Sequence, residues 1–170
     1  LVIMHDTFAA QLKKGILDIA YSLDPPMEYP DLAILCERSE TLGFYVSPAH
    51  SLAEKKRVTE RDLENIPLLL TSHTCTFRRM LLEDLTSESV VPRIALETSS
   101  KEILKQFAVN ELGVAFVPDM TVREEIKQGL LKKLKWAGCD FPICSRVYIH
   151  KDKHMNKAIC ELVNQIAEST

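Results

Sequence analysis

The feature that most constrains the fold is a strand–helix–strand unit in the second half of the chain. Arg93–Glu97 is a short strand-like run, and the hydroxyls of Thr98–Ser100 are suited to begin a helix. That helix is expected from about Lys101 to Leu112, and Gly113 ends it as the residue best suited to a left-handed turn. Val114–Val117 is wholly apolar, as in a fully buried strand. Strand, helix and strand also follow one another in Leu1–Tyr21, which is the pattern of a parallel crossover, and this alternation predicts an α/β fold.

The same alternation of strands and helices extends through the rest of the chain. Further strands are expected at Leu1–Met4, Leu17–Tyr21, Leu32–Cys36, Gly43–Ser47, Pro67–Thr71 and Arg146–His150. Further helices are expected around Phe8–Gly15, Phe77–Leu85, Thr121–Gln128 and Asn156–Glu168, the last with Ile159, Leu162, Val163 and Ile166 facing inward. The sheets are therefore predicted to be mainly parallel.

The charge of the chain argues against direct contact with nucleic acid. The net charge is -3, whereas DNA-binding domains usually present a basic face to the phosphates. The most basic stretch, Glu54–Arg61, is interrupted by acids and is interpreted as a solvated loop. Apolar runs are only a few residues long, so no membrane span is predicted. Leu1–Met4 lacks the features of a signal peptide and is interpreted as a strand that begins abruptly, which predicts a truncated chain.

The cysteines and histidines predict neither a metal site nor catalysis. The five cysteines, Cys36, Cys75, Cys139, Cys144 and Cys160, form no CxxC pair and lie near no histidine cluster. They are expected to be reduced thiols of a cytoplasmic protein. No nucleotide-binding or hydrolase motif occurs, and His73 and Cys75 lack an orienting acid. The sequence therefore predicts no cofactor, no metal and no enzyme activity.

Five short motifs in a fixed order resemble the effector-binding domain of bacterial LysR-type transcriptional regulators. Leu12 to Ala20 is similar to the family's "L..G.LD.A", and Ser47 to Ala53 to its "P..HPLA". Asp62-Leu63 is followed by Pro67–Leu70, and Glu97 to Pro118 is similar to "E..S.E.ik..v..GLG.a.lP". Gln128–Leu131 is similar to "el..G.L", which completes the order. Two departures stand out: Ser51 replaces the usual proline, and Glu111 the first glycine of Gly-Leu-Gly.

The resemblance implies a type 2 periplasmic-binding-protein-like fold, in which two lobes are joined by two crossing strands. The lobes are expected at residues 1–47 with 143–170 and at residues 48–142. The family's first strand and helix are expected to be missing, as is the N-terminal winged helix-turn-helix through which members bind DNA. The resemblance also implies an effector in the cleft between the lobes, and antiparallel homodimers that form a tetramer in the full-length protein. The helix Lys101–Leu112 is expected to face the partner.

Three polar turns are the candidates for ligand contact, because open α/β sheets bind ligands beyond the carboxyl ends of their strands. The first turn holds Ser72, His73, Thr74, Cys75 and Thr76, with Arg78 in the following helix; the second holds Thr98, Ser99 and Ser100; the third holds Tyr21 and Ser22. Free amides at helix starts favour a negatively charged ligand, so a small anion is predicted. The alternative is that these hydroxyls only cap helices.

The arginines and Cys75 leave further alternatives open. Arg78 and Arg79 are adjacent and so face different sides of their helix, which leaves one of them to pair with an anion. Arg146 is interpreted either as a surface residue or as a second clamp on the acid. The Cys75 thiol is expected to have a lowered pKa at a helix start, which would suit a single-thiol redox sensor. A solute-binding protein of a transport system is the other alternative, disfavoured by five unpaired cysteines.

Overall fold

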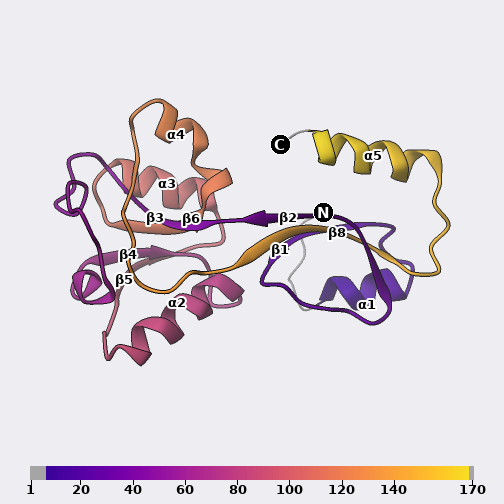
Figure 1. Ribbon diagram of the computed structural model, residues 1–170, viewed down its shortest axis with the longest axis horizontal. Coiled ribbons are helices and arrows are strands. Elements are labelled where there is room, and N and C mark those ends of the chain that lie inside the picture. The colour runs from indigo at the N-terminus through magenta and orange to yellow at the C-terminus, as the bar shows by residue number, and fades with distance from the viewer. Residues whose placement is uncertain (1–6, 169–170) are drawn as a thin grey trace. The chain divides into compact units, whose positions relative to one another are not determined.

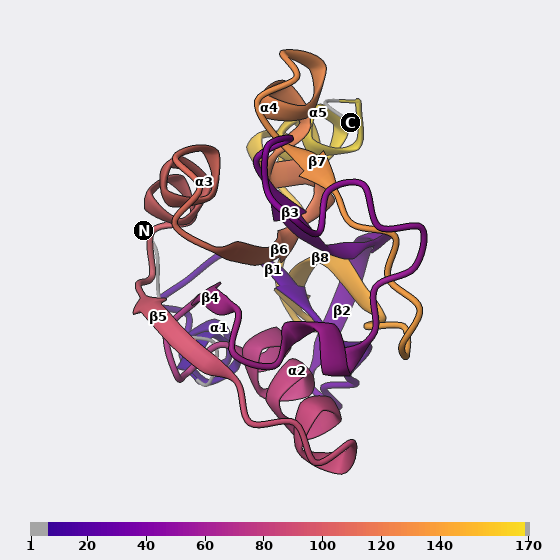
Figure 2. The ribbon, with the colours of Figure 1, turned by 90° about the vertical axis from the view of Figure 1, so that its left-hand side faces the viewer.

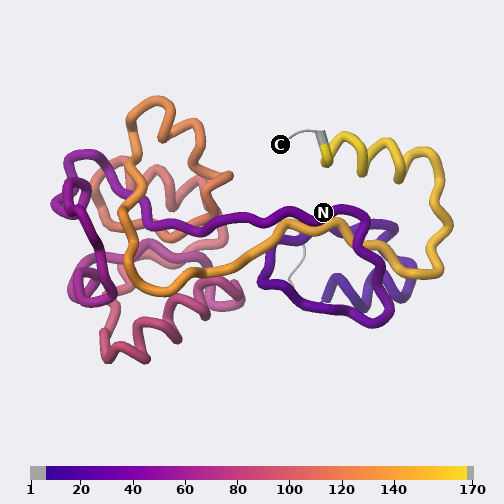
Figure 3. The backbone as a smooth tube through the Cα atoms, in the orientation of Figure 1, coloured from indigo at the N-terminus to yellow at the C-terminus, as the bar shows by residue number. Residues whose placement is uncertain are grey.

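The chain forms two compact units in a computed structural model that describes residues 7–168. The larger unit is Glu40–Pro142. The smaller unit combines the described residues up to Ser39 with those from Ile143 onward. The chain therefore passes from one unit to the other twice, as the trace in Figure 3 shows. Figure 1 labels the α-helices and most of the strands of both units.

The larger unit is built on a five-stranded mixed sheet. Its strands, in spatial order, are β5 (Arg93–Glu97), β4 (Pro67–Leu70), β6 (Val114–Pro118), β3 (Leu42–Val46) and β7 (Lys132–Lys133). β4 runs parallel to β5 and β6, whereas β3 runs antiparallel to β6 and β7. The expectation of mainly parallel sheets is wrong: β3 here and the Ala20–Asp24 strand of the smaller unit both run antiparallel to their neighbours. β3 enters its sheet from the smaller unit instead of through a crossover helix, so nothing forces it to run parallel.

Both faces of this sheet are buried. Leu68 and Leu70 pack with Phe44 and Phe116 in one cluster, and Leu69 packs with Leu104 in another. Because successive side chains of a strand point to opposite faces, the continuous Leu68–Leu70 run serves both clusters. Helix α2 (Thr76–Ser87) and helix α3 (Lys101–Val109) lie on opposite sides of the sheet (Figure 2).

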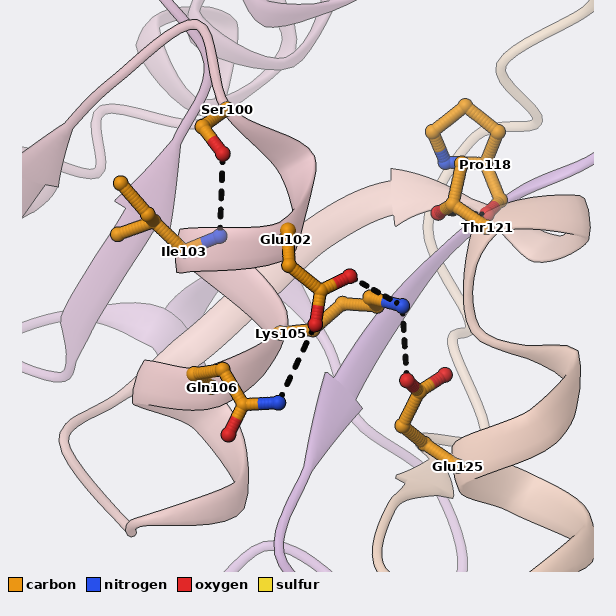
Figure 4. A network of polar contacts seen from close by, with 8 residues as sticks. All are labelled: Ser100, Glu102, Ile103, Lys105, Gln106, Pro118, Thr121 and Glu125. Atoms are coloured by element: carbon orange, nitrogen blue, oxygen red, sulfur yellow. Dashed lines mark hydrogen bonds and ion pairs between the residues drawn. The ribbon is translucent and has the colours of Figure 1, made fainter.

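Short helices and an ion-pair network complete the larger unit. The 3-10 helix η2 (Glu60–Leu63) overlaps the end of the stretch Glu54–Arg61 that was interpreted as a solvated loop, and η3 (Asp119–Thr121) precedes α4 (Arg123–Lys127). Lys105 of α3 lies 2.8 Å from Glu102 Oε2 and 2.7 Å from Glu125 Oε1 (Figure 4). This lysine therefore fixes α4 against α3.

The turn after α3 contains two residues of positive φ, Glu111 and the expected Gly113. Glu111 has a φ of 63°, while Gly113 has a φ of 155°. A Cβ at Gly113 would lie 2.4 Å from the backbone oxygen of Pro67. Gly113 is therefore required for the close approach of its backbone to β4, and the turn places a glutamate in a conformation that favours glycine.

The smaller unit has a three-stranded sheet in the order β1-β8-β2. These strands are β1 (Ala20–Asp24), β8 (Ile143–His150) and β2 (Leu32–Glu40), and β1 runs antiparallel to β8. Helix α1 (Phe8–Lys13) packs Phe8 and Leu12 onto Leu32 and Tyr148. The strand expected at Leu1–Met4, which is the first strand of the crossover predicted for Leu1–Tyr21, lies outside the described residues.

Two details of the smaller unit differ from the sequence prediction. Helix α5 (Lys157–Glu168) buries Ile159, but Leu162, expected to face inward, is 42% exposed. The chain was expected to change lobes after residue 47, but β3 pairs within the sheet of the larger unit, so residues 42–46 belong there. The second predicted lobe boundary, at residue 143, coincides with the end of the larger unit at Pro142.

Candidate functional site

The carboxyl ends of β4 and β5 bring two of the predicted polar turns together. Because these strands are parallel neighbours, the turn after Leu70 and the turn after Glu97 leave the same edge of the sheet. The Thr98 amide donates to the Leu70 carbonyl oxygen at 3.2 Å, which joins the two turns directly. We name this region the strand-end site: Ser72–Thr76, Arg78 and Glu97–Ser100.

Arg78 is the buried cation of the strand-end site. It lies in the first turn of α2 and is 9% exposed, while the neighbouring Arg79 is exposed. The two arginines thus face different sides of the helix, as expected. Arg78 Nη1 lies 2.7 Å from Glu97 Oε2, and its buried Nε has no hydrogen-bond acceptor in the part of the chain that the structure describes.

Glu97 is a residue of the strand-end site for which the sequence alone predicts no ligand contact. Its Oε1 accepts from the His73 amide at 3.1 Å and lies 3.3 Å from His73 Nδ1. Burial alone would raise the pKa of Glu97, but the His73 hydrogen bonds and the Arg78 charge outweigh it and lower the pKa. The Glu97 carboxylate is therefore already bound to Arg78 and to the His73 amide, which are donors of the turn that was predicted to hold an anion. The available signal was its place as the last residue of β5, directly before the Thr98–Ser100 turn.

Several hydroxyls of the strand-end site make local hydrogen bonds. Ser72 Oγ and Thr74 Oγ1 lie 3.2 Å apart, and Thr98 Oγ1 accepts from the Ser100 amide at 3.2 Å. Ser100 is the N-cap of α3, since its Oγ accepts from the Ile103 amide at 3.3 Å (Figure 4). The capping alternative thus holds for Ser100, whereas Thr98 and the Ser72–Thr74 pair shape the turns themselves.

Cys75 is the N-cap residue of α2, and its thiol is not activated. Burial raises the pKa of Cys75, and the Thr71 hydroxyl and the Phe77 and Arg78 amides offset this only in part. The expectation of a lowered pKa at this helix start is wrong. The physical reason is that the sulfur is desolvated, which disfavours the thiolate more than the helix start favours it. Thr76 follows as the first residue of α2 and is half-buried.

An open groove of about 580 Å³ runs along α2 beside this site. Its lining residues all belong to the larger unit: His73, Arg78, Arg79, Leu82, Glu83, Thr86 and Ser87. The volume falls within the range of small-molecule sites in proteins. Arg78 and His73 therefore belong both to the strand-end site and to a cavity that can hold a small ligand.

Ser22 and Arg146 lie in the smaller unit, where they pair across β1 and β8. Arg146 is 8% exposed and its Nε lies 2.5 Å from Glu37 Oε2. Its Nη1 donates to the Met27 carbonyl oxygen at 2.6 Å and to the Tyr148 hydroxyl at 3.3 Å. Arg146 is thus buried and not the surface residue of one interpretation. The Ser22 hydroxyl is buried and has no hydrogen-bond partner among residues 7–168.

The predicted site residues therefore fall into two groups. Seven of them lie together in the larger unit: Ser72, Thr74, Cys75, Thr76, Arg78, Thr98 and Ser99. Tyr21 follows Ala20 on the opposite face of β1 from Ser22 and is exposed. Within residues 7–168, no cluster of three or more potential metal ligands occurs, and no helix is long and apolar enough to cross a bilayer.

Comparison with known proteins identifies the family. A family model described as the LysR substrate binding domain matches residues 2–170. The chain is 31% identical over 166 residues to the HTH-type transcriptional regulator YwqM of Bacillus subtilis (strain 168), covering 96% of this chain and 56% of YwqM. The chain spans about half the length of the curated relatives it matches, whose names are those of transcription regulators.

Solved structures share the fold. The regulatory domain of CcmR from Synechocystis PCC6803, in complex with 2-PG, matches with a TM-score of 0.80 at 17% identity, covering 98% of this chain and 79% of that one. The effector binding domain of QuiR, in complex with shikimate, matches with a TM-score of 0.74 at 15% identity, covering 97% and 77%. The predicted α/β, type 2 periplasmic-binding-protein-like fold is confirmed. The chain belongs to the LysR substrate-binding domain family.

Proposed function

We propose that the chain is the effector-sensing domain of a bacterial LysR-type transcription regulator and binds a small anionic metabolite at the strand-end site. The observation that carries this proposal is Arg78, a buried arginine that lines an open groove at the carboxyl ends of parallel strands. A charge-assisted hydrogen bond from arginine contributes about 1.5–3 kcal/mol. That preference favours an acid over its neutral analogue by at least an order of magnitude.

The other residues of the larger unit have supporting roles in this proposal. Ser72, Thr74, Cys75 and Thr76 supply polar groups and amides around the start of α2, and Thr98 and Ser99 do so at the start of α3. The amides at a helix start favour negative charge by about 0.3–1 kcal/mol. The CcmR and QuiR domains were solved with 2-PG and with shikimate, which supports a small-molecule ligand for this fold.

Of the two candidates in the smaller unit, Ser22 and Arg146, we propose only Ser22 as a ligand contact. Arg146 already donates to Glu37, Met27 and Tyr148, so a structural role fits it better. Ser22 keeps a buried hydroxyl that a ligand group can satisfy. The position of an effector between two lobes stays a prediction of the family resemblance.

The regulatory output is proposed from the family. An N-terminal winged helix-turn-helix would bind DNA, and effector binding would shift the population of conformations that this segment reads. We place the protein in the cytoplasm, where the chromosome of a bacterium lies, and assign it no enzyme activity. Electrophoretic mobility shift of the full-length protein on its own promoter, with and without the acid, measures this coupling.

Self-association is proposed through α3 and the edge strand β5. Ile103 and Phe107 lie one helical turn apart on α3 and are exposed, and β5 exposes Ile94 at the end of the sheet. An exposed apolar helix face and an exposed apolar residue on an edge strand are both features that interfaces use. We propose an antiparallel homodimer, and a tetramer for the full-length protein; sedimentation equilibrium measures both states.

Isothermal titration calorimetry tests the ligand proposal. The chain is titrated with a panel of small carboxylates and with inorganic phosphate, and the best acid is compared with its amide. Arg78→Gln should weaken binding of that acid about tenfold or more. Arg79→Gln is the matched control, since it removes the same charge from the exposed neighbour, and Thr76→Ala probes the helix start. Equal affinities for Arg78→Gln and the parent would place the ligand elsewhere.

A further inference from the structure

Arg78 is not free to receive an external acid, because Glu97 lies on it. The Nη1 atom that Glu97 contacts at 2.7 Å is itself buried, as is Nε. The second carboxylate oxygen of Glu97, Oε1, accepts a hydrogen bond from the His73 amide and lies within hydrogen-bond distance of the His73 ring nitrogen Nδ1. A ligand that uses these donors must therefore replace Glu97 atom for atom.

The two partners of this ion pair differ in their freedom to move. The Arg78 side chain is 11% exposed and is fixed in the first turn of α2, next to the buried Phe77. The Glu97 side chain is 39% exposed and stands at the end of β5, which is an edge strand of the sheet. If the pair separates, Glu97 returns to water while Arg78 stays in the groove. The carboxylate is thus the movable member.

From this asymmetry we propose that Glu97 is a resident competitor that an acidic effector must displace from Arg78 and His73. The inference rests on the proposed function and adds a residue that sets its affinity and specificity. A ligand that succeeds offers what Glu97 offers: one anionic oxygen for Arg78 and a second for His73. A carboxylate or a phosphate meets this requirement, whereas an amide supplies only one acceptor and no charge.

The competition also makes the site selective. A neutral ligand forms too weak an interaction with Arg78 to displace Glu97. Because Glu97 belongs to the same chain, its carboxylate is always available to compete for Arg78. Glu97 in addition keeps Arg78 paired when no effector is bound, so that the buried charge is compensated in both states. Removing the carboxylate should therefore tighten acid binding instead of weakening it, which is the opposite of the result for Arg78.

Calorimetry on Glu97→Gln tests the proposal with the best acid of the panel and its amide. Glu97→Gln keeps the size of the side chain and removes its charge, and it should bind the acid about tenfold tighter than the parent. Its affinity for the amide should change less than the affinity for the acid. Glu83→Gln is the matched control: it removes the same charge from another groove residue and should raise acid affinity far less. Glu97→Ala, which also lacks the carboxylate, should act in the same direction as Glu97→Gln.

The outcomes separate this inference from the proposed function. Arg78-dependent acid binding that is unchanged or weakened in both Glu97 variants overturns the inference and leaves the proposed function standing. If Glu97→Gln binds an acid and the parent protein does not, the inference is supported, because Glu97 then prevents the acid from reaching Arg78 in the parent. If neither the parent nor the Glu97 variants bind any acid, the proposed function fails and the inference fails with it.

Discussion

The two units bury arginines in different ways. Among the described residues, Arg146 of the smaller unit donates to three acceptors from three segments: Glu37 in β2, Met27 in a loop and Tyr148 in β8. Arg78 of the larger unit has one carboxylate partner, Glu97, and lines an open groove. The two arginines are thus similarly buried, but the donors of Arg146 are taken up by protein acceptors, whereas a ligand can replace the single partner of Arg78.

This difference separates a structural arginine from a candidate binding arginine. A buried polar group that the protein satisfies fully has little to gain from a ligand, and losing it leaves several acceptors without donors. A buried guanidinium with one movable partner can exchange that partner for a ligand. Burial of the arginine does not distinguish the two cases. What distinguishes them is how many acceptors the protein supplies to the guanidinium and how exposed those acceptors are.

The units also differ in their cores. The larger unit has large apolar clusters on both faces of its sheet, whereas Leu12 of the smaller unit packs in a cluster of four buried residues, with Phe8, Leu32 and Tyr148. A residue at the centre of an extensive core leaves a cavity that cannot collapse, while the surroundings of a small cluster relax more easily.

The largest expected effect is on the core of the larger unit. Leu81→Ala should lower the free energy of unfolding by about 3–5 kcal/mol, and Leu12→Ala in the smaller unit by about 2–3 kcal/mol. Urea unfolding followed by the fluorescence of Trp136, the single tryptophan, reports on the larger unit, and circular dichroism reports on both. A Leu12→Ala variant that shifts the Trp136 transition as far as Leu81→Ala does would show that the units unfold as one.

An intermediate effect should distinguish the two buried arginines. Arg146→Gln should cost about 2–3 kcal/mol of stability, because the Met27 carbonyl and the Tyr148 hydroxyl lose their donor. Arg78→Gln should cost about 1 kcal/mol or less, because its partner Glu97 returns to water. Urea unfolding of both variants in parallel measures this order. If Arg78→Gln proved the more destabilising, Arg78 would be a structural residue and the contrast between the units would disappear.

The smallest effect on folding is expected at the exposed face of α3. Phe107 is 36% exposed, so Phe107→Glu should change the free energy of unfolding by less than about 0.5 kcal/mol. The same change should weaken self-association at least tenfold, because it puts a charge into the proposed interface. Sedimentation equilibrium measures the association, with the exposed Gln106→Glu as a control outside the apolar face. Unaltered association of Phe107→Glu would remove α3 from the interface.

The sequence by itself determined the local elements and the family. The apolar run Val114–Val117 and the hydroxyls before Lys101 predicted the strand–helix–strand unit, and β5 occupies the expected Arg93–Glu97. The strand-end turn containing Ser72–Thr76 and Arg78 was found because strand ends and helix starts are set by neighbouring residues. Periodicity, turn residues and motif order are all local information, so one sequence carries them.

Only the tertiary structure decided which groups meet. A strand such as β3 has the same apolar pattern in either direction, so its antiparallel pairing was not available from the sequence. Glu97 and Arg78 lie 19 residues apart, and Arg146 and Glu37 lie 109 apart. The sequence lists these donors and acceptors without saying which of them pair. The raised pKa of Cys75 has the same origin, because desolvation depends on the side chains that surround the sulfur after folding.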